Sequence, residues 1–146
     1  MLDTTRRIRT DVYNRLASTG RAPSVAELAE STGAGRDSVE DDLRLLHDGH
    51  DLVLGTNGEV RMALPFSAVP TRFTVTADGV DHWANCAWDA LAIPITLKQN
   101  ATISAEVDGD TATIEMDVTD GTLVAPEGLV HFAVPARRWW DDIVDT

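Results

Sequence analysis

The spacing of apolar residues changes part-way along the chain, and this change constrains the fold more than any other feature. Near the N-terminus, apolar side chains recur every three or four residues, as in Ile8, Val12 and Leu16, which is typical of an amphipathic helix. Apolar and polar residues instead alternate over 101–107 and again over 112–118, as expected for a β-hairpin with one buried face. The sequence therefore predicts an α+β fold, helical in its first half and sheet-rich in its second.

Three helices are predicted in the first half. Gly20 is expected to end the first of them, because glycine commonly terminates a helix. Ser24 and Glu27 have the spacing of a capping box, in which the hydroxyl and the carboxylate each satisfy a free backbone N–H at a helix start. The Gly33-Ala34-Gly35 turn separates this second helix from a third. Together, these elements form a helix-turn-helix pattern.

A short hairpin is predicted after the third helix. Segments 52–54 and 60–62 are extended, and the Asn-Gly pair within 55–58 suits the turn between them. Helices and hairpin together predict a winged-helix-like region, which is typical of DNA binding; a packing or dimerisation module is the alternative. The third helix carries more acids than arginines, with Arg36 and Arg44 as its basic residues. This charge argues against a nucleic-acid partner, because recognition helices need cations that face phosphates.

A linker is expected after this hairpin. Residues 64–70 contain Pro65 and Pro70 and show neither the helical nor the strand period. The predicted organisation is a winged-helix-like domain at 1–63, a linker at 64–70 and a core domain at 71–146, with a small mixed or antiparallel sheet and a cysteine-bearing helix.

The core domain is expected to contain further short elements besides the hairpin. The turn at 108–110 joins the two hairpin strands. The other elements are a strand over 72–76, a helix over 83–92 that Pro94 ends, a strand over 129–134 and a short helix after Pro135.

Composition excludes several classes of protein. The 146 residues include 12 Lys and Arg against 24 Asp and Glu, a formal charge of -12, so this acidic protein should repel nucleic acid and anionic membranes. One cysteine excludes an internal disulfide framework and a multi-cysteine zinc site, and it indicates a reducing compartment. No stretch approaches the roughly 20 apolar residues of a membrane span. We therefore expect a soluble, cytoplasmic protein without a membrane partner.

Cys86 and Asp89 form the strongest candidate for a chemical site. Three residues apart on a helix, their side chains project from the same face. A thiolate binds soft metals such as mercury, and a neighbouring carboxyl can deliver or accept a proton. The alternative is structural, with Cys86 as a small buried apolar residue and Asp89 as a helix cap or surface acid.

Three neighbouring side chains are predicted to line the same pocket. Trp83 and Trp88, like Trp139 and Trp140, would exclude water and accept an apolar organic group, and packing between the two domains is their alternative role. His82 would lower the pKa of the thiol or bind the same metal if the helix begins early enough. The chain lacks a phosphate-binding glycine loop, a Gly-x-Ser-x-Gly elbow and a zinc-metalloprotease helix, which excludes nucleotide chemistry and serine hydrolysis.

The segment Asn85-Cys86-Ala87-Trp88-Asp89-Ala90-Leu91, closed by Pro94, resembles the Cys-x-x-Asp core motif of the bacterial organomercurial lyase (alkylmercury lyase) family. The order of elements is also similar. It comprises a winged-helix-like region, the Pro-Phe-Ser-Ala-Val-Pro segment at 65–70, the cysteine-bearing helix, a hairpin and Trp-Trp-Asp-Asp at 139–142.

This resemblance implies protonolysis of a carbon–mercury bond and hence a role in mercury resistance. In the family, two cysteine thiolates hold the mercury of an organomercurial, an aspartate delivers a proton to the carbon, and a hydrocarbon leaves. Hg(II) then passes to small thiols or to a mercuric reductase. The resemblance implies that Cys86 binds mercury and that Asp89 is the proton donor, with no cofactor.

The resemblance also implies a second cysteine shortly after the segment 139–144 and a further C-terminal segment. The sequence contains Cys86 alone. A small-molecule thiol or Cys86 of a second copy in a homodimer is then the expected source of the other thiolate, unless Cys86 acts alone. Two alternative functions follow, a non-catalytic mercury or soft-metal binder and a winged-helix metal-responsive regulator.

Overall fold

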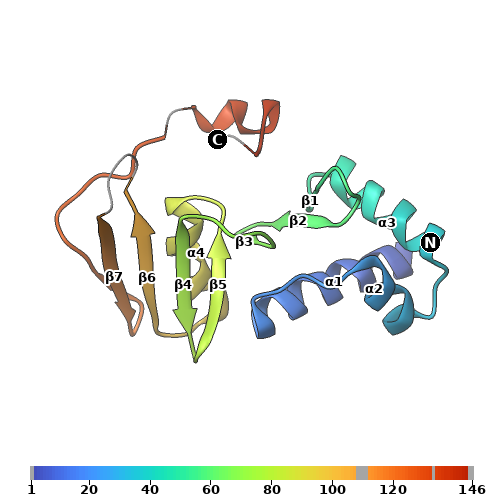
Figure 1. The fold of residues 1–146 in the computed structure, drawn as a ribbon, viewed down its shortest axis with the longest axis horizontal. Coiled ribbons are helices and arrows are strands. Elements are labelled where there is room, and N and C mark those ends of the chain that lie inside the picture. Colours follow the sequence, from blue (N-terminus) through green and yellow to red (C-terminus); the bar gives the residue numbers. More distant parts are fainter. Residues whose placement is uncertain (1, 108–111, 133, 145–146) are drawn as a thin grey trace.

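A computed structural model describes residues 2–107, 112–132 and 134–144 of the chain. Three helices come first, followed by a sheet whose strands are interrupted by a fourth helix (Figure 1). The helices of the described residues are α1 Leu2–Thr19, α2 Val25–Thr32, α3 Arg36–Asp48, α4 Ala87–Leu97 and the 3-10 helix η1 Ala136–Asp141. The strands are β1 Val53–Leu54, β2 Val60–Ala63, β3 Phe66–Ser67, β4 Phe73–Ala77, β5 Val80–Ala84, β6 Ala101–Glu106, β7 Thr113–Thr119 and β8 Thr122–Val124.

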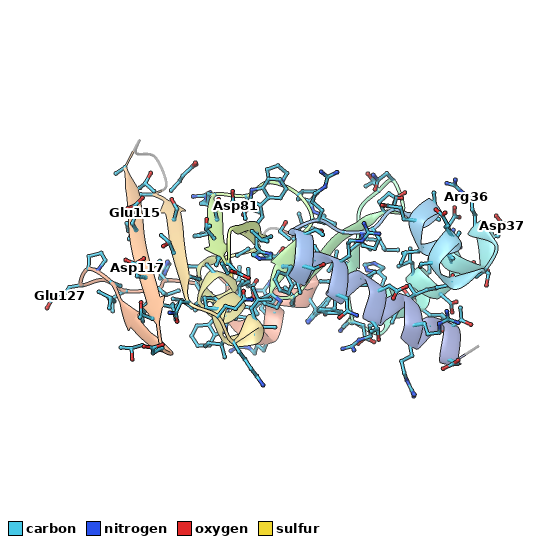
Figure 2. All side chains as sticks on the ribbon, turned by 90° about the horizontal axis from the view of Figure 1, so that it is seen from below. Arg36, Asp37, Asp81, Glu115, Asp117 and Glu127 are labelled. Carbon is cyan, nitrogen blue, oxygen red and sulfur yellow. The ribbon has the colours of Figure 1, made fainter. Side chains whose placement is uncertain are left out.

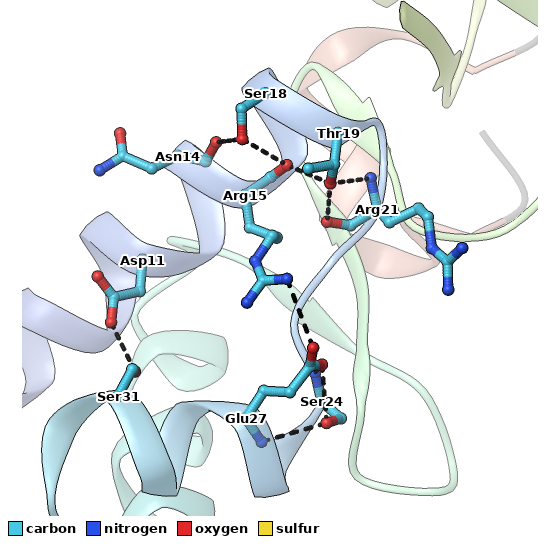
Figure 3. A network of polar contacts seen from close by, with 9 residues as sticks. All are labelled: Asp11, Asn14, Arg15, Ser18, Thr19, Arg21, Ser24, Glu27 and Ser31. Atoms are coloured by element: carbon cyan, nitrogen blue, oxygen red, sulfur yellow. Dashed lines mark hydrogen bonds and ion pairs between the residues drawn. The ribbon is translucent and has the colours of Figure 1, made fainter.

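The three N-terminal helices pack through the apolar faces that their sequence predicts. Ile8, Val12 and Leu16 of α1 are completely buried. Around the start of α2, Ser24 and Glu27 form the expected capping box, in which the Ser24 backbone N–H donates to Glu27 Oε2 at 2.8 Å. Figure 3 shows how polar contacts join α1 to α2 beside this cap, including Arg15 with Glu27 at 3.4 Å. The α+β class predicted from the period is confirmed.

One antiparallel sheet runs through both halves of the molecule, in the order β1-β2-β3-β5-β4-β6-β7-β8. The segment 64–70, expected to be a linker without strand character, contains β3. This strand pairs with β2 through Ala63 and Phe66 and with β5 through Phe66 and Ala84. The hairpin that follows the helices is therefore continuous with the sheet of the second half.

Helix α1 contacts β5 at its C-terminal end. Gly20 follows this helix with a φ of 69°, and a Cβ atom there would collide with the backbone carbonyl of Asp81. Both the left-handed backbone and the close approach require glycine. On the other side of the fold, α4 contacts β4, β5 and β6 and buries Ala90, Ile93 and Pro94.

The predicted helix over 83–92 is wrong at both ends. Its first residue, Trp83, belongs to strand β5, and α4 begins at Ala87 with Cys86 as its N-cap. Pro94 lies inside α4, which continues to Leu97. The helix tolerates this proline, although its ring nitrogen cannot donate the usual backbone hydrogen bond.

The C-terminal part also differs from expectation. The strand predicted over 129–134 is absent from the described residues of that segment, which are irregular. The short helix after Pro135 is present as η1, and β8 is a three-residue strand that was not expected. The predicted turn at 108–110 lies outside the described residues.

Exposed acidic side chains lie on the strands of the sheet and on the segment after β8. Figure 2 shows Glu115, Asp117 and Glu127 toward the end of the molecule opposite Arg36 and Asp81 nearer the middle, and all four carboxylates are exposed. Within the described part of the chain, no helix is both long and apolar enough to cross a membrane.

Candidate active site

Cys86 and Asp89 meet at the start of α4. Cys86 is the N-cap, with extended backbone angles (φ -149°, ψ 178°), and Asp89 lies in the first helical turn. The Cys86 thiol donates to Asp89 Oδ2, with 3.5 Å between sulfur and oxygen. Their three-residue spacing therefore places a soft metal ligand directly beside a carboxyl group.

Asn85 connects this pair to the sheet. Its amide Nδ2 donates to Asp89 Oδ2 at 3.3 Å, and it also lies 3.3 Å from the Phe66 carbonyl and 3.4 Å from the Pro65 carbonyl. The acceptors belong to the segment around β3. The first turn of α4 is thus tied to a strand about twenty residues earlier in the chain.

A small cavity of about 50 Å³ opens beside these side chains. Asn85, Cys86 and Asp89 supply its polar groups, and the remaining walls are apolar. These walls are Met62 and Leu64 on one side and Phe132, Trp139, Ile143 and Val144 from the C-terminal segment. Such a cavity suits a small ligand with an apolar organic group and one atom that binds sulfur.

Burial shifts both titratable groups of the site in the same direction. The pKa of the Cys86 thiol is raised, chiefly by burial, while the backbone N–H groups of Asp89 and Trp88 oppose the shift and the Asp89 charge adds to it. Burial also raises the pKa of Asp89, against hydrogen bonds from Asn85 and Cys86 that lower it. Both shifts favour the protonated forms, so the site holds protons more firmly than exposed groups would.

The other three predicted pocket residues lie away from this cavity. His82 is buried in β5 and packs against Phe66, with 5.5 Å between ring centroids. Trp83 is in the same strand, and neither residue lines the cavity. Trp88 is 57% exposed and lies on a separate apolar groove with Leu91, Ile95, Val118 and Leu123.

Sequence reasoning missed the walls that come from distant parts of the chain. Trp139 is the exception, because the tryptophan content already indicates an aromatic wall. In the structure its ring packs on Phe132 at 5.3 Å between centroids, and its Nε1 donates to the Val134 carbonyl at 2.8 Å. Met62 and Leu64 carry no chemical signal of their own. Asn85 belongs to the segment 85–91, and its position directly before Cys86 is the one sequence signal that points to it.

Metal ligands do not gather elsewhere in the described chain, where no group of three or more His, Cys, Asp or Glu side chains could hold a metal ion. At the site itself, a family model described as MerB, alkylmercury lyase, matches residues 66–146, which include Cys86, Asp89 and the whole C-terminal wall of the cavity.

The chain belongs to the alkylmercury lyase family. A solved structure, described as the mercury-bound form of MerB2, has a similar fold with a TM-score of 0.63 and 22% sequence identity. The match covers 84% of this chain and 58% of that one, so the chain spans little more than half of the other protein's length. Among curated proteins, none matches the sequence.

Proposed function

We propose that this alkylmercury lyase family member cleaves the carbon–mercury bond of small organomercurials, with Cys86 as the mercury-binding thiolate and Asp89 as the proton donor. The observation that carries this proposal is the 3.5 Å contact between Cys86 Sγ and Asp89 Oδ2 on the wall of a small, mostly apolar cavity. One side chain binds mercury while the other supplies a proton at the same place. Family membership adds independent support for organomercurial chemistry.

The first step is capture. The Cys86 sulfur forms a bond to the mercury of R–Hg–X, where X is a halide or a thiolate. The Hg–X bond breaks and X⁻ leaves, while the S–H proton passes to the Asp89 carboxylate. The raised pKa of Asp89 favours retention of this proton, because burial disfavours the charged carboxylate. Apolar walls such as Phe132 and Trp139 accommodate the organic group R.

The second step is protonolysis. The proton of Asp89 is transferred to the carbon, the carbon–mercury electron pair becomes the new C–H bond, and the hydrocarbon R–H leaves. Mercury stays as Hg(II) on the Cys86 sulfur, and Asp89 returns to its carboxylate form. No electron is gained or lost overall. One small thiol then binds Hg(II) as a second sulfur ligand and loses its proton to solvent. A second small thiol displaces Hg(II) from Cys86 and leaves its proton on the Cys86 sulfur, since soft metals bind thiolates in preference to water.

A headspace assay tests this function. Purified protein is mixed with an organomercurial and excess small thiol, and the released hydrocarbon is measured against a protein-free background. We expect Cys86→Ser to abolish both mercury capture and release. Asp89→Ala should retain capture and slow release by about 10²- to 10⁴-fold, the contribution typical of a general acid. Asp37→Asn, at an exposed acid in the first turn of α3, is the matched control and should leave release unchanged.

The outcomes separate this proposal from its alternatives. Equal capture by wild type and Cys86→Ser would contradict the site. Mercury retained on Cys86 without hydrocarbon release would leave a soft-metal binder in place of a lyase. A DNA-binding regulator receives no support from α3, because Arg44 is already paired with Glu40 at 3.2 Å and Asp41 at 2.6 Å.

A further inference from the structure

Asn85 is a polar group of the cavity to which the reaction steps above give no role. Its Nδ2 has three acceptors around it, the carbonyls of Pro65 and Phe66 and the Asp89 carboxylate. An amide nitrogen carries two hydrogens. One N–H is therefore available to Asp89, and the other is shared between the two adjacent carbonyls.

The orientation of this amide follows from its surroundings. Rotation by 180° would bring Asn85 Oδ1 against the same three acceptors, an arrangement with no hydrogen bond and mutual repulsion. In the observed orientation, Oδ1 is buried and has no partner among the described residues. A buried acceptor without a partner costs free energy, and the fold accepts this cost while it keeps Nδ2 directed at Asp89.

Asp89 Oδ2 thus receives two donors from consecutive residues. Asn85 Nδ2 is 3.3 Å away and Cys86 Sγ is 3.5 Å away. The Asn85 donor is itself anchored to the backbone of residues 65 and 66, next to and within β3. The carboxyl oxygen is therefore held near the sulfur by a group that is fixed to the sheet.

We propose that Asn85 is the positioning residue for Asp89, holding Oδ2 beside the Cys86 sulfur so that one oxygen faces both the thiol and the carbon of a mercury compound bound there. This inference rests on the proposed function and extends it to a residue outside the Cys-x-x-Asp pair. As the proton leaves Asp89, negative charge develops on the carboxylate, and the Asn85 N–H bond to it strengthens. A contact that strengthens along the reaction accelerates cleavage more than it strengthens binding.

The test separates capture from cleavage. Asn85→Ala removes the amide and should slow hydrocarbon release by about 10²-fold, the effect typical of losing one fixed donor. Stoichiometric capture of the organomercurial by the Cys86 thiol should change less than about twofold, because the sulfur and its helix are retained. Asn85→Gln keeps an amide and should recover part of the lost rate. Asn14→Ala, at an exposed asparagine of α1, is the matched control.

Asn85→Leu provides a second variant without a donor, in case the smaller alanine side chain impairs folding. Parallel loss of capture and cleavage in the folded variants, or unchanged cleavage, would overturn the proposal. A crystal structure of Asn85→Ala gives a result that does not depend on activity, because the Asp89 carboxyl should move away from Cys86 Sγ. An unmoved carboxyl would also overturn it. If wild-type protein releases no hydrocarbon, the proposed function fails, and this structural comparison still decides whether Asn85 positions Asp89.

Discussion

The N-terminal helices and the C-terminal segment differ sharply in how they are held. Leu43 of α3 and the apolar face of α1 are completely buried, whereas Leu129 is 99% exposed and Val124 of β8 is 62% exposed. The described residues of 125–144 form no strand, and η1 contains no buried residue. A segment with so few buried side chains has a low local free energy of opening.

The cavity has one wall on well-packed elements and another on the loosely held C-terminal segment. Asn85, Cys86 and Asp89 lie where β5 and α4 meet, on elements fixed by sheet pairing and helix packing. The opposite wall belongs to residues 132–144. Trp140 of this segment stacks on His50, which follows α3, with 3.9 Å between ring centroids. The proposed chemistry therefore takes place on the well-packed wall of the cavity, and the organic group would contact the loosely held wall.

Truncation of one leucine in each region should give the largest contrast in stability. Leu43→Ala should lower the free energy of unfolding by about 2–5 kcal/mol, because it leaves a cavity in a packed core. Leu129→Ala should change it by less than about 0.5 kcal/mol, because nothing covers that side chain. Urea titration followed by circular dichroism measures both. Equal losses would refute the comparison.

A smaller loss in the free energy of unfolding is expected from a substitution at the contact between α1 and β5. Gly20→Ala introduces a left-handed alanine and a collision with the Asp81 carbonyl. Gly33→Ala also has a positive φ, of 71°, but its added carbon meets nothing within 4 Å. Gly20→Ala should therefore cost about 1–3 kcal/mol more than Gly33→Ala, the range typical of overpacking. Similar melting temperatures for the two variants would show that the backbone around Gly20 and Asp81 can shift at little cost in stability.

The smallest expected effect is a dependence of stability on pH at the same junction. Burial lowers the pKa of His82, although neighbouring Asp81 and the Leu16 backbone oppose the shift. The unfolded chain then binds a proton more readily than the folded one, so this contribution to stability is complete above the ordinary histidine pKa of about 6.5 and decreases as pH falls below it.

Thermal melts at several pH values between 5 and 8 measure this dependence. His82→Leu should flatten the profile, because it removes the buried group that titrates. His131→Leu, at an exposed histidine, should leave the slope unchanged. An identical slope for wild type and His82→Leu would assign the dependence to other groups.

The comparison also shows what the sequence could predict about the fold. Helical period and the capping box are local signals, and α1, α2 and α3 followed from them. The boundary between β5 and α4 was misplaced because Trp83 is compatible with either element, and Pro94 gave a false helix end. The strand expected over 129–134 has apolar residues but lacks a pairing partner in the described structure, and pairing is a tertiary property.

The site divides in the same way. The proximity of Cys86 and Asp89 follows from their three-residue spacing at the start of α4, and Asn85 is adjacent to Cys86. The cavity also brings Phe132 and Trp139 together with Met62, about seventy residues earlier in the chain. No local pattern specifies that encounter. Trp88, which the sequence places beside Cys86, instead lies in the first turn of α4 where its ring faces the separate apolar groove.

Strand β3 makes the two halves of the chain inseparable for protein engineering. It pairs with β2 on one side and β5 on the other, and the carbonyls of residues 65 and 66 are acceptors for the Asn85 amide. A fragment that began at residue 71 would expose the edge of β5 to pairing with other chains, which favours aggregation. It would also release the amide beside Asp89. The proposed site cannot therefore be transplanted as its helix and hairpin alone.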